Sequence, residues 1–426
     1  MQEFSSFLDN LKTLVSFNTE KARPLPNAPF GAETAKALDC FLSIAKDMGF
    51  ETKNYDNYIG EVTIGEGEEI GIIGHLDVVP AGEGWSTPPF TLTEIDGSYF
   101  ARGIEDNKSP LLLCLYALKE LKDSGKPINR KFRLFAGCNE EDGWEDVAYF
   151  KKHYSFPEYG FSPDGNFPLT YAEKGMYEII FTIPTLKRFR KVKGGTVVNA
   201  VCANASAVAD ESVIDKTLLD EYGLILDGNE IKSVGKAAHG SKPHLGKNAL
   251  IALLSFFIDS GEDDKLLSRA LEYILLDKKD IGKFNNEQGR VTLSAGLIEE
   301  KDGKIIITCD CRIPAPLSLT DITPFFDSFG IPYSVKERHE PMMVEKDGWL
   351  VSSLLSAYNE VTGECAQPIS MGGCTFARAF KKGCSFGPTL HNANHNIHTA
   401  NEFITKTDLL KIYEIYKSAI FKLAEK

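Results

Sequence analysis

The stretch KFRLFAGCNEEDGWEDVAYFKKHY, residues 131–154, decides the fold that we expect for this chain. Its opening, KFRLFAGC, is an apolar run typical of a buried strand, and its end, WEDVAYFKKHY, has the pattern of a helix. Between them Glu140 and Glu141 are adjacent, although neighbouring side chains of a strand point to opposite faces. We therefore expect the strand to end near Cys138, where a turn of the backbone can give the two glutamates different roles.

Strands and helices alternate on both sides of this stretch. Two further strand patterns and two helix patterns lie at residues 60–65, 69–75, 31–49 and 109–125. Ser109 is the expected N-cap of the helix at 109–125, with Pro110 at its first position. The alternation predicts an α/β fold, in which a mixed, mostly parallel sheet is flanked by helices. In such sheets binding sites lie beyond the carboxyl ends of the strands.

The pattern changes at about Met176. Antiparallel strands joined by turns such as LDGN and KDGK follow, with helices between them, as far as about Pro341. Helical and loop segments then return. We therefore predict a discontinuous α/β domain formed by residues 1–176 and 342–426, and an inserted α+β domain formed by residues 177–341.

The composition excludes several classes of function. The chain has 426 residues and a formal net charge of −13, which repels a phosphate backbone, so we expect no nucleic-acid partner. A hydrophobic content of 43% and a charged content of 25% are typical of a globular protein. No apolar run is long enough to cross a bilayer, so we also expect no membrane partner.

The N-terminus and the cysteines bear on the compartment. MQEFSSFLDNLKTLVSF has the spacing of an amphipathic helix and lacks the basic start and the cleavage site of a signal peptide. The cysteines, 9 in number, are scattered and form no CxxC pair, so we interpret them as reduced thiols. Both observations favour a cytoplasmic protein.

Histidines and carboxylates stand at the ends of the predicted strands and in the loops. They are His75, Asp77, Asp106, Glu140, Glu141, Asp164 and His398. Taken singly, each is equally consistent with an ordinary role, such as that of a turn histidine or a helix-entry aspartate. Taken together, they offer hard or borderline ligands without thiolate, which suit one or two divalent cations such as zinc, manganese or cobalt.

Several motifs occur in order along nearly the whole chain. They are GHLDVVPAGEGW, ARGIEDNK, NEEDG, SPDG, GKAAHGSKPHLGKNA and HTANE. With these motifs the chain resembles the dinuclear metallopeptidases that include aminoacylases, glutamate carboxypeptidase and the bacterial dipeptidase PepV. GHLDVVPAGEGW and the DNK form of the second motif are most similar to the PepV-type dipeptidases.

The resemblance implies a catalytic domain that binds two metal ions. His75, Asp106 and Asp164 would hold one ion. Asp106, Glu141 and His398 would hold the other, with Asp106 as the bridging ligand. Zinc is the first expectation for both ions, with manganese and cobalt as alternatives.

The resemblance also implies two residues that act on the ligands and on water. Asp77 would orient the imidazole of His75. Glu140 would be the general base, which takes a proton from a metal-bridging water and passes it to the leaving amine. The peptide bond between Asp106 and Asn107 would be cis, as is typical of the family at this position.

Other residues are expected to contact the substrate. The resemblance makes the inserted domain a lid, in which His239 reaches the scissile carbonyl oxygen and Asn199 provides a second contact. Arg312 would clamp the C-terminal carboxylate of the substrate, although an ordinary strand-surface charge is the alternative for this residue. The remaining expected contacts lie in MGGCTFARAF and are Gly372, Gly373, Thr375 and Arg378.

The segment HNANHNIH offers other histidines as possible ligands. The family motif HTANE selects His398 and leaves His391 and His395 as loop residues. His244 has no assigned role either.

These observations favour a metal-dependent dipeptidase that cleaves dipeptides with a free N-terminus. A deacylase of the same family, which acts on N-acyl amino acids or succinyl-diaminopimelate, is the alternative. A non-catalytic metal-binding relative is a third interpretation, which the complete set of expected ligands and Glu140 disfavours. We expect a small peptide as the partner and a monomer, because the long insertion resembles the enlarged lid that replaces a dimer partner in PepV-type enzymes; a homodimer stays the alternative.

Overall fold

The computed structural model describes residues 3–391, 393 and 395–425, and the chain divides into two units. The first unit comprises Met1–Tyr171, Met343–Ile369 and Thr375–Lys426, and the second comprises Ala172–Met342 and Ser370–Cys374. The second unit thus includes a short segment at 370–374 that the sequence analysis placed with the α/β domain. Whether these units are the catalytic and lid domains of the predicted division stays a prediction.

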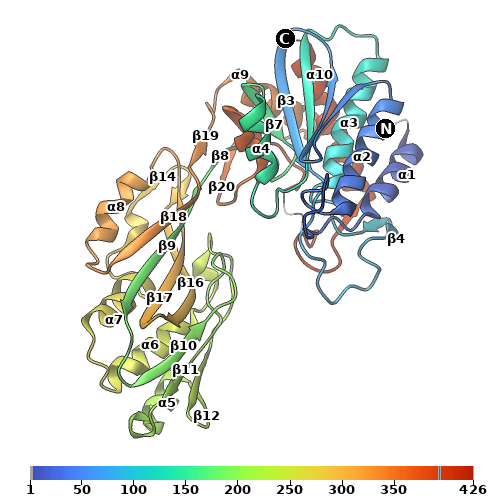
Figure 1. Cartoon of the computed structure of the whole chain (residues 1–426). Coiled ribbons are helices and arrows are strands. Elements are labelled where there is room, and N and C mark those ends of the chain that lie inside the picture. Colours follow the sequence, from blue (N-terminus) through green and yellow to red (C-terminus); the bar gives the residue numbers. More distant parts are fainter. Residues whose placement is uncertain (1–2, 392, 394, 426) are drawn as a thin grey trace. The chain divides into compact units, whose positions relative to one another are not determined.

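The first unit contains a mixed sheet whose central strands are parallel (Figure 1). The strand order is β1 (Glu51–Tyr55), β2 (Ile59–Ile64), β6 (Arg130–Gly137), β3 (Glu68–His75), β7 (Tyr159–Ser162), β21 (Lys382–Ser385) and β8 (Thr170–Glu173). β3 pairs in parallel with β6 on one side and with β7 on the other, and β21 pairs in parallel with β7. β1, β2 and β6 pair antiparallel. The predicted fold class is confirmed.

Helices cover both faces of this sheet. In the described part of the unit they are α1 (Phe4–Val15), α2 (Ala32–Asp47), α3 (Lys108–Asp123), α4 (Glu145–His153), the 3-10 helix η5 (Phe376–Ala379), α9 (Trp349–Thr362) and α10 (Lys406–Glu425). A Cβ added to Gly74 of β3 would meet Leu111 of α3, whereas one added to Gly71 would meet the ring of Phe380, which follows η5. Because both faces are covered, the second half of β3 is a continuous buried run.

The start of α3 differs from the prediction. The helix begins at Lys108, with Asn107 at the N-cap position, so Ser109 is not the N-cap and Pro110 is not the first residue. Asn107 makes no side-chain cap bond, because its amide group binds the end of β3 and the loop after β7. Pro110 is still tolerated, since the first turn of a helix has no partner for its backbone N–H groups.

A small sheet brings the C-terminal part of the chain beside the segment that leads into α3. It consists of β4 (Thr93–Ile95), β5 (Ser98–Phe100) and β22 (Phe403–Thr405). Phe403 pairs with Phe100, and the backbone N–H of Ala101 donates to the carbonyl of Glu402. For this reason Gly103 and Glu402 are neighbours, although they are almost 300 positions apart in the sequence.

The second unit is an antiparallel sheet with helices, as predicted. Its strand order is β12 (Ile225–Asp227), β13 (Glu230–Val234), β11 (Asn204–Ala209), β10 (Phe189–Gly194), β16 (Thr292–Lys301), β17 (Lys304–Ile313), β9 (Gly175–Pro184) and β18 (Tyr333–His339). Its helices include α5 (Lys216–Tyr222), α6 (Ala249–Asp259), α7 (Lys265–Arg269), the π-helix η3 (Ala270–Leu275) and α8 (Leu319–Asp327). Buried and partly exposed residues alternate along β9, so one face of the sheet packs on the hydrophobic core of this unit.

The remaining elements are short. The second unit also contains η1 (Glu211–Val213), η2 (Pro243–Leu245), η4 (Ile281–Lys283), β14 (Asn285–Asn286) and β15 (Gly289–Arg290), while β19 (Met342–Met343) and β20 (Ile369–Met371) lie where the chain passes between the units. Among the described residues no helix has both the length and the apolar character that a membrane span requires.

Candidate metal centre

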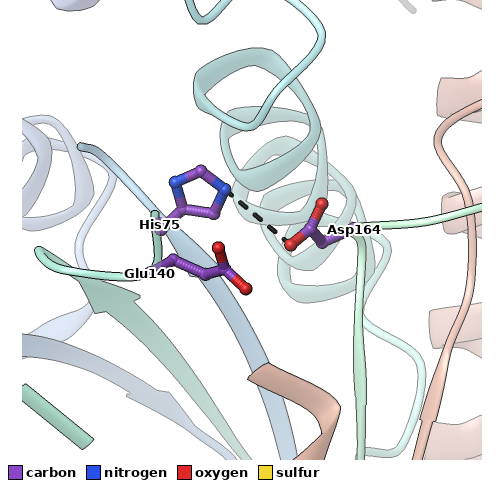
Figure 2. A group of neighbouring side chains, drawn as sticks. All are labelled: His75, Glu140 and Asp164. Atoms are coloured by element: carbon purple, nitrogen blue, oxygen red, sulfur yellow. Dashed lines mark ion pairs between the residues drawn. The ribbon is translucent and has the colours of Figure 1, made fainter. Parts of the chain in front are cut away.

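Parallel pairing brings the predicted ligands to one edge of the first unit's sheet. β3 pairs in parallel with both β6 and β7, so the carboxyl ends of these strands meet at the same edge. His75 is the last residue of β3, and Asp164 lies in the loop after β7. Glu140 and Glu141 follow the end of β6, because the strand ends at Gly137, close to the predicted position. Figure 2 shows His75, Glu140 and Asp164 pointing toward one another.

Asp106 lies between two histidines. Its Oδ1 is 3.0 Å from Nε2 of His75, and its Oδ2 is 2.8 Å from Nε2 of His398. The Nε2 atom of His75 is also 3.8 Å from Oδ2 of Asp164, and that of His398 is 3.4 Å from Oε1 of Glu141. The Nε2 atom of each imidazole therefore faces Asp106 and one further carboxylate, which is the arrangement expected if Asp106 bridges two cations.

The carboxylate of Asp77 binds backbone N–H groups of the turn that follows β6, residues 138–142, which we call the acidic turn. The N–H of Glu140 donates to Oδ1 of Asp77 and the N–H of Glu141 donates to Oδ2, both at 3.0 Å. The imidazole Nδ1 of His75 lies 2.9 Å from the backbone oxygen of Asp77 and 3.5 Å from its carboxylate. The carboxylate thus binds the glutamate amides more closely than the imidazole that it was expected to orient, and both contacts fix residues of the candidate site.

Asn107 joins three segments of the candidate site. The Asp106–Asn107 peptide bond is cis, as expected. The side-chain Nδ2 of Asn107 donates to the carbonyl of Pro163 at 2.5 Å, and its Oδ1 accepts the backbone N–H of His75 at 3.3 Å. Sequence reasoning missed this role, although Asn107 belongs to the ARGIEDNK motif that carries the resemblance.

Glu402 was also missed by sequence reasoning. Its Oε1 accepts the backbone N–H groups of Glu105 and Asp106 at 2.9 and 3.2 Å. Its Oε2 accepts the N–H of Gly103 at 3.0 Å and an Nη1–H of Arg102 at 2.7 Å. The carboxylate is buried, and burial raises its pKa to about 7. The signal that could have found it is its place in the HTANE motif.

The electrostatics of the two histidines and of Asp106 are coupled. Hydrogen bonds to Asp106 and Glu141 raise the pKa of His398 to about 11. Burial lowers the pKa of His75, but hydrogen bonds to Asp106 and Asp77 outweigh it and raise that pKa well above the usual value. Burial raises the pKa of Asp106, yet its contacts with His398 and His75 hold it below the usual range. The two imidazoles therefore favour the ionised form of the Asp106 carboxyl.

The other carboxylates of the candidate site repel one another. Burial raises the pKa values of Glu140, Glu141 and Asp164. The charge of Asp106 adds to the shift of Glu141 and Asp164, and the charge of Asp164 adds to that of Glu140. Oε1 of Glu141 is buried, and its distance of 3.4 Å from Nε2 of His398 is long for a hydrogen bond. Divalent cations would remove this repulsion and give Oε1 a closer partner, so the residues present fit a metal centre.

Two groups of residues could each hold a metal ion by their geometry. In the described residues these are His75, Glu140 and Asp164, and His75, Asp106 and Glu141, whose ligand atoms lie within 4.8 Å of one another. Both glutamates are thus within reach of a cation. The contact between Glu141 and His398 distinguishes them, because it places Glu141 at the second histidine.

In the second unit, His239 and Asn199 lie close together. Ala200, which follows Asn199, forms a β-bridge with His239. The N–H of Gly240 donates to the carbonyl of Asn199 at 2.7 Å. Nδ1 of His239 accepts the backbone N–H of Ser241 at 3.2 Å and lies 2.8 Å from its hydroxyl oxygen. The proton of the neutral imidazole is therefore on Nε2. Both side chains are exposed, as expected for residues that contact a ligand.

Arg312 is not a strand-surface charge, which was one of the two interpretations of this residue. Its side chain is buried in the second unit, where Nε donates to Asp310 at 2.8 Å and Nη1 donates to the carbonyl of Gly372 at 3.0 Å. This hydrogen bond places Gly372, and with it the adjacent Gly373, beside Arg312, so these predicted substrate contacts lie together. Contact with a substrate carboxylate stays a prediction.

Thr375 and Arg378 lie in the first unit, and the structure gives them local roles. Thr375 is buried, its Oγ1 accepts the N–H of Ala377 at 3.2 Å, and the same oxygen lies 2.8 Å from Oγ of Ser385. It therefore caps η5. The carbonyl of Arg378 accepts a hydrogen bond from Lys151 at 3.0 Å. Substrate contact by these two residues stays a prediction.

The histidines without an assigned role differ in their burial. His244 and His391 are exposed, whereas His395 is buried and forms ion pairs with Glu105 at 2.7 Å and with Asp408 at 3.1 Å.

Known proteins match nearly the whole chain. The sequence profile described as peptidase family M20/M25/M40 matches residues 71–422. A protein named Beta-Ala-Xaa dipeptidase, from Lactobacillus delbrueckii subsp. lactis, is 32% identical over 456 aligned positions, which cover 99% of this chain and 96% of the relative.

Solved structures show a similar fold. The aminopeptidase PepT from Bacillus cereus superposes with a TM-score of 0.63 at 15% identity, and the match covers 99% of this chain and 98% of that one. Human carnosine dipeptidase 1 has a TM-score of 0.59 at 16% identity, with 99% and 97% covered. Because a family profile spans most of the sequence and a dipeptidase aligns along nearly all of it, the chain belongs to peptidase family M20/M25/M40 and is a hydrolase that acts on peptide bonds.

Proposed function

We propose that this protein is a metal-dependent dipeptidase that hydrolyses the peptide bond of dipeptides with a free N-terminus. The observation that carries the proposal is Asp106, whose two carboxylate oxygens face different histidines, each of which also faces a further carboxylate. The dipeptidase name of a relative that aligns along nearly the whole chain supports the substrate class.

Two divalent cations would be held by the candidate ligands. His75, Asp106 and Asp164 hold one, and Asp106, Glu141 and His398 hold the other; zinc suits this mixed set of imidazole and carboxylate, as do manganese and cobalt. When bound, such ions polarise the scissile carbonyl and make a water molecule more acidic.

Glu140 is the general base in this proposal. Its carboxylate points to the same space as His75 and Asp164 (Figure 2). Burial raises its pKa well above the usual value, and the charge of Asp164 adds to this effect. A carboxylate with a raised pKa takes a proton from the attacking water readily and can return it to the leaving amine. Asp77 fixes the direction of Glu140 by binding its backbone N–H.

Residues of the second unit would recognise the substrate. His239 presents Nε2–H as a neutral donor, which suits the oxygen of the scissile carbonyl, and Asn199 provides a second contact beside it. Arg312, oriented by Asp310, binds the C-terminal carboxylate, with the backbone of Gly372 and Gly373 next to it.

A substrate comparison tests this function. Purified protein, reconstituted with Zn²⁺ or Mn²⁺, is assayed against dipeptides that begin with an α-amino acid or with β-alanine, and against the same dipeptides with an acetylated N-terminus. We expect the free dipeptides to be cleaved faster. Faster cleavage of the acetylated compounds, or of N-acyl amino acids, would instead identify a deacylase of the same family.

The role of Glu140 predicts the effect of one substitution. Glu140→Gln keeps the shape of the side chain and removes the base, so we expect kcat to fall by about 10²–10⁴-fold. Asp142→Asn is the matched control, because Asp142 is an exposed carboxylate of the same turn that pairs with Lys21. Turnover of Glu140→Gln close to that of the control would show that the base is another residue, with Glu141 as the first alternative.

The oligomeric state is a separate proposal. We infer a monomer, because the second unit is large and has its own hydrophobic core. Sedimentation velocity of the metal-loaded protein checks this, and a dimer mass at micromolar concentration would overturn it.

A further inference from the structure

The acidic turn is held by hydrogen bonds to its backbone at four consecutive positions. Four consecutive N–H groups, those of Cys138, Asn139, Glu140 and Glu141, are each bound by a carboxylate. Asp77 accepts the last two. Asp146 accepts the first two with a single oxygen, Oδ2, at 2.7 and 2.9 Å. The direction of both glutamate side chains is therefore set from two sides.

We propose that Asp146 is a positioning residue for the reaction, which fixes Glu140 and Glu141 by binding the backbone immediately before them. The inference rests on the proposed function, in which Glu140 is the base and Glu141 a metal ligand. Asp146 touches neither the substrate nor the cations and acts through the turn alone.

Asp146 is tied to a rigid part of the first unit. Its Oδ1 accepts the N–H of Val147 at 2.7 Å, so the carboxylate connects the acidic turn to the first turn of α4. The apolar face of this helix packs Val147 and Phe150 into a buried cluster with Phe135 and Phe376. The turn is thus anchored to a packed helix, and a shift of the turn requires Asp146 to release its bonds.

The local sequence leaves room for this contact. A Cβ added to Gly137, the last residue of β6, would lie 2.8 Å from Oδ2 of Asp146 and 2.4 Å from the ring of Phe376. A side chain at position 137 would therefore displace the carboxylate. Because Gly137 has no side chain, the carboxylate of Asp146 can approach the backbone N–H groups of Cys138 and Asn139.

The burial of Asp146 separates it from ordinary acids at a helix start. Acids in the first turn of a helix usually stabilise it from the surface, as Glu145 does here while paired with Lys21. Asp146 is fully buried, and burial together with the charge of Asp77 raises its pKa to about 7. Burying a carboxylate this deeply costs stability. The contribution of Asp146 is therefore the geometry that its hydrogen bonds to three backbone N–H groups impose on the turn.

Asp146→Asn tests the inference. The carboxamide has one accepting oxygen, so it can bind either the N–H groups of the turn or that of Val147, and its NH2 group then faces a donor. We expect kcat to fall by about 10–100-fold and the affinity for Zn²⁺ to fall by a similar factor, with KM for the dipeptide unchanged. Calorimetric titration of the metal-free protein with Zn²⁺ and steady-state kinetics give the two values.

The matched control is Asp142→Asn, which makes the same change from carboxyl to carboxamide on the exposed side of the same turn. The inference is wrong if the kcat and the Zn²⁺ affinity of Asp146→Asn equal those of this control. If the wild-type protein binds Zn²⁺ but cleaves no peptide, the proposed function fails instead, and the comparison of Zn²⁺ affinities still decides the role of Asp146.

A second variant covers the case in which Asp146→Asn does not fold. Asp146→Ser keeps one accepting oxygen in a smaller side chain, which suits the start of a helix. We expect it to fold and to show a fall in kcat at least as large as that of Asp146→Asn. If neither variant gives folded protein while Asp142→Asn does, Asp146 is a structural residue of the whole unit and the inference is overturned.

Discussion

Glu402 shows how a single carboxylate holds a candidate ligand in place. Its two oxygens bind three backbone N–H groups of the segment 103–106 and the guanidinium of Arg102, all of them donors. Asp106, the residue between the two histidines, is the last member of that segment. The position of the bridging carboxylate therefore depends on Glu402.

We predict that Glu402→Gln weakens metal binding. The carboxamide presents its NH2 group to donors on one side, either to Gly103 and Arg102 or to Glu105 and Asp106, so the segment must move. The affinity for Mn²⁺ should fall by about 10–100-fold, as measured by calorimetric titration of the metal-free protein. Glu94→Gln, a change at an exposed residue of the nearby β4, is the control. Equal Mn²⁺ affinity in both variants would contradict the role of Glu402.

Sequence patterns could identify the candidate ligands but not the residues that hold them. His75 stands at the end of an apolar strand, Asp164 follows closely after one, and His398 lies in a motif, so each leaves a local signal. The contact between Glu402 and Glu105 joins positions 297 apart, and nothing in the spacing predicts it. Asp146 has the pattern of an ordinary acid at the start of a helix, and a pattern of charges does not reveal that its side chain is buried.

At the scale of elements, the alternation of strands and helices was enough to predict the parallel centre of the sheet. It could not predict the strand order. β21 lies between β7 and β8, although more than 200 residues separate it from either strand in the sequence. Strand order is set by packing between distant segments, whereas the apolar patterns describe each segment by itself.

The start of α3 illustrates the same limit. Ser109 followed by Pro110 is a favourable local signal for a helix start, yet the helix begins earlier, at Lys108. Asn107 takes the N-cap position while its side chain binds His75, at the end of β3, and Pro163, in the loop after β7. Contacts within the candidate site thus override the local preference.

The loop before β22 is tied to α10 by a buried histidine. His395 pairs with Glu105 and with Asp408, a residue in the first turn of α10. Burial lowers the pKa of His395, but the hydrogen bonds and charges of Glu105 and Asp408 outweigh burial and raise it above 6.5. The protonated imidazole therefore stabilises the docking of this loop on the helix.

This raised pKa predicts a pH dependence of stability. A group whose pKa is higher in the folded state contributes its full stabilisation below its unfolded pKa and loses it as the pH rises through the folded one. We expect His395→Gln to lower the free energy of unfolding by about 3–5 kcal/mol near pH 6, and by less near pH 9. Urea denaturation at both pH values measures the difference.

The control for this prediction is His391→Gln, because His391 is an exposed histidine of the same segment. Its effect on the free energy of unfolding should be small at both pH values. If the effect of His395→Gln stayed constant from pH 6 to pH 9, the imidazole would act by packing and hydrogen bonding in its neutral form.

At the scale of the whole molecule, the candidate ligands are confined to one of the two units. His75, Asp106, Glu141, Asp164 and His398 all belong to the first unit, and the second unit has a separate hydrophobic core. A ligand that binds only folded protein stabilises the structure that contains its site. Removal of metal should therefore lower the stability of the first unit and leave that of the second nearly unchanged.

The tryptophans make this prediction measurable. The chain has 3 of them, Trp85, Trp144 and Trp349, and all lie in the first unit, so tryptophan fluorescence reports its unfolding alone. At a free metal concentration of 100 times Kd, removal with a chelator should cost about 2.7 kcal/mol of stability in the first unit. Hydrogen exchange of the paired strands β16 and β17 reports the second unit, where we expect no change. The control is His75→Ala, which lacks a ligand and should respond to the chelator much less than the wild type. A loss of protection in β16 and β17 as large as that in the first unit would show that metal binding is not confined to the candidate site.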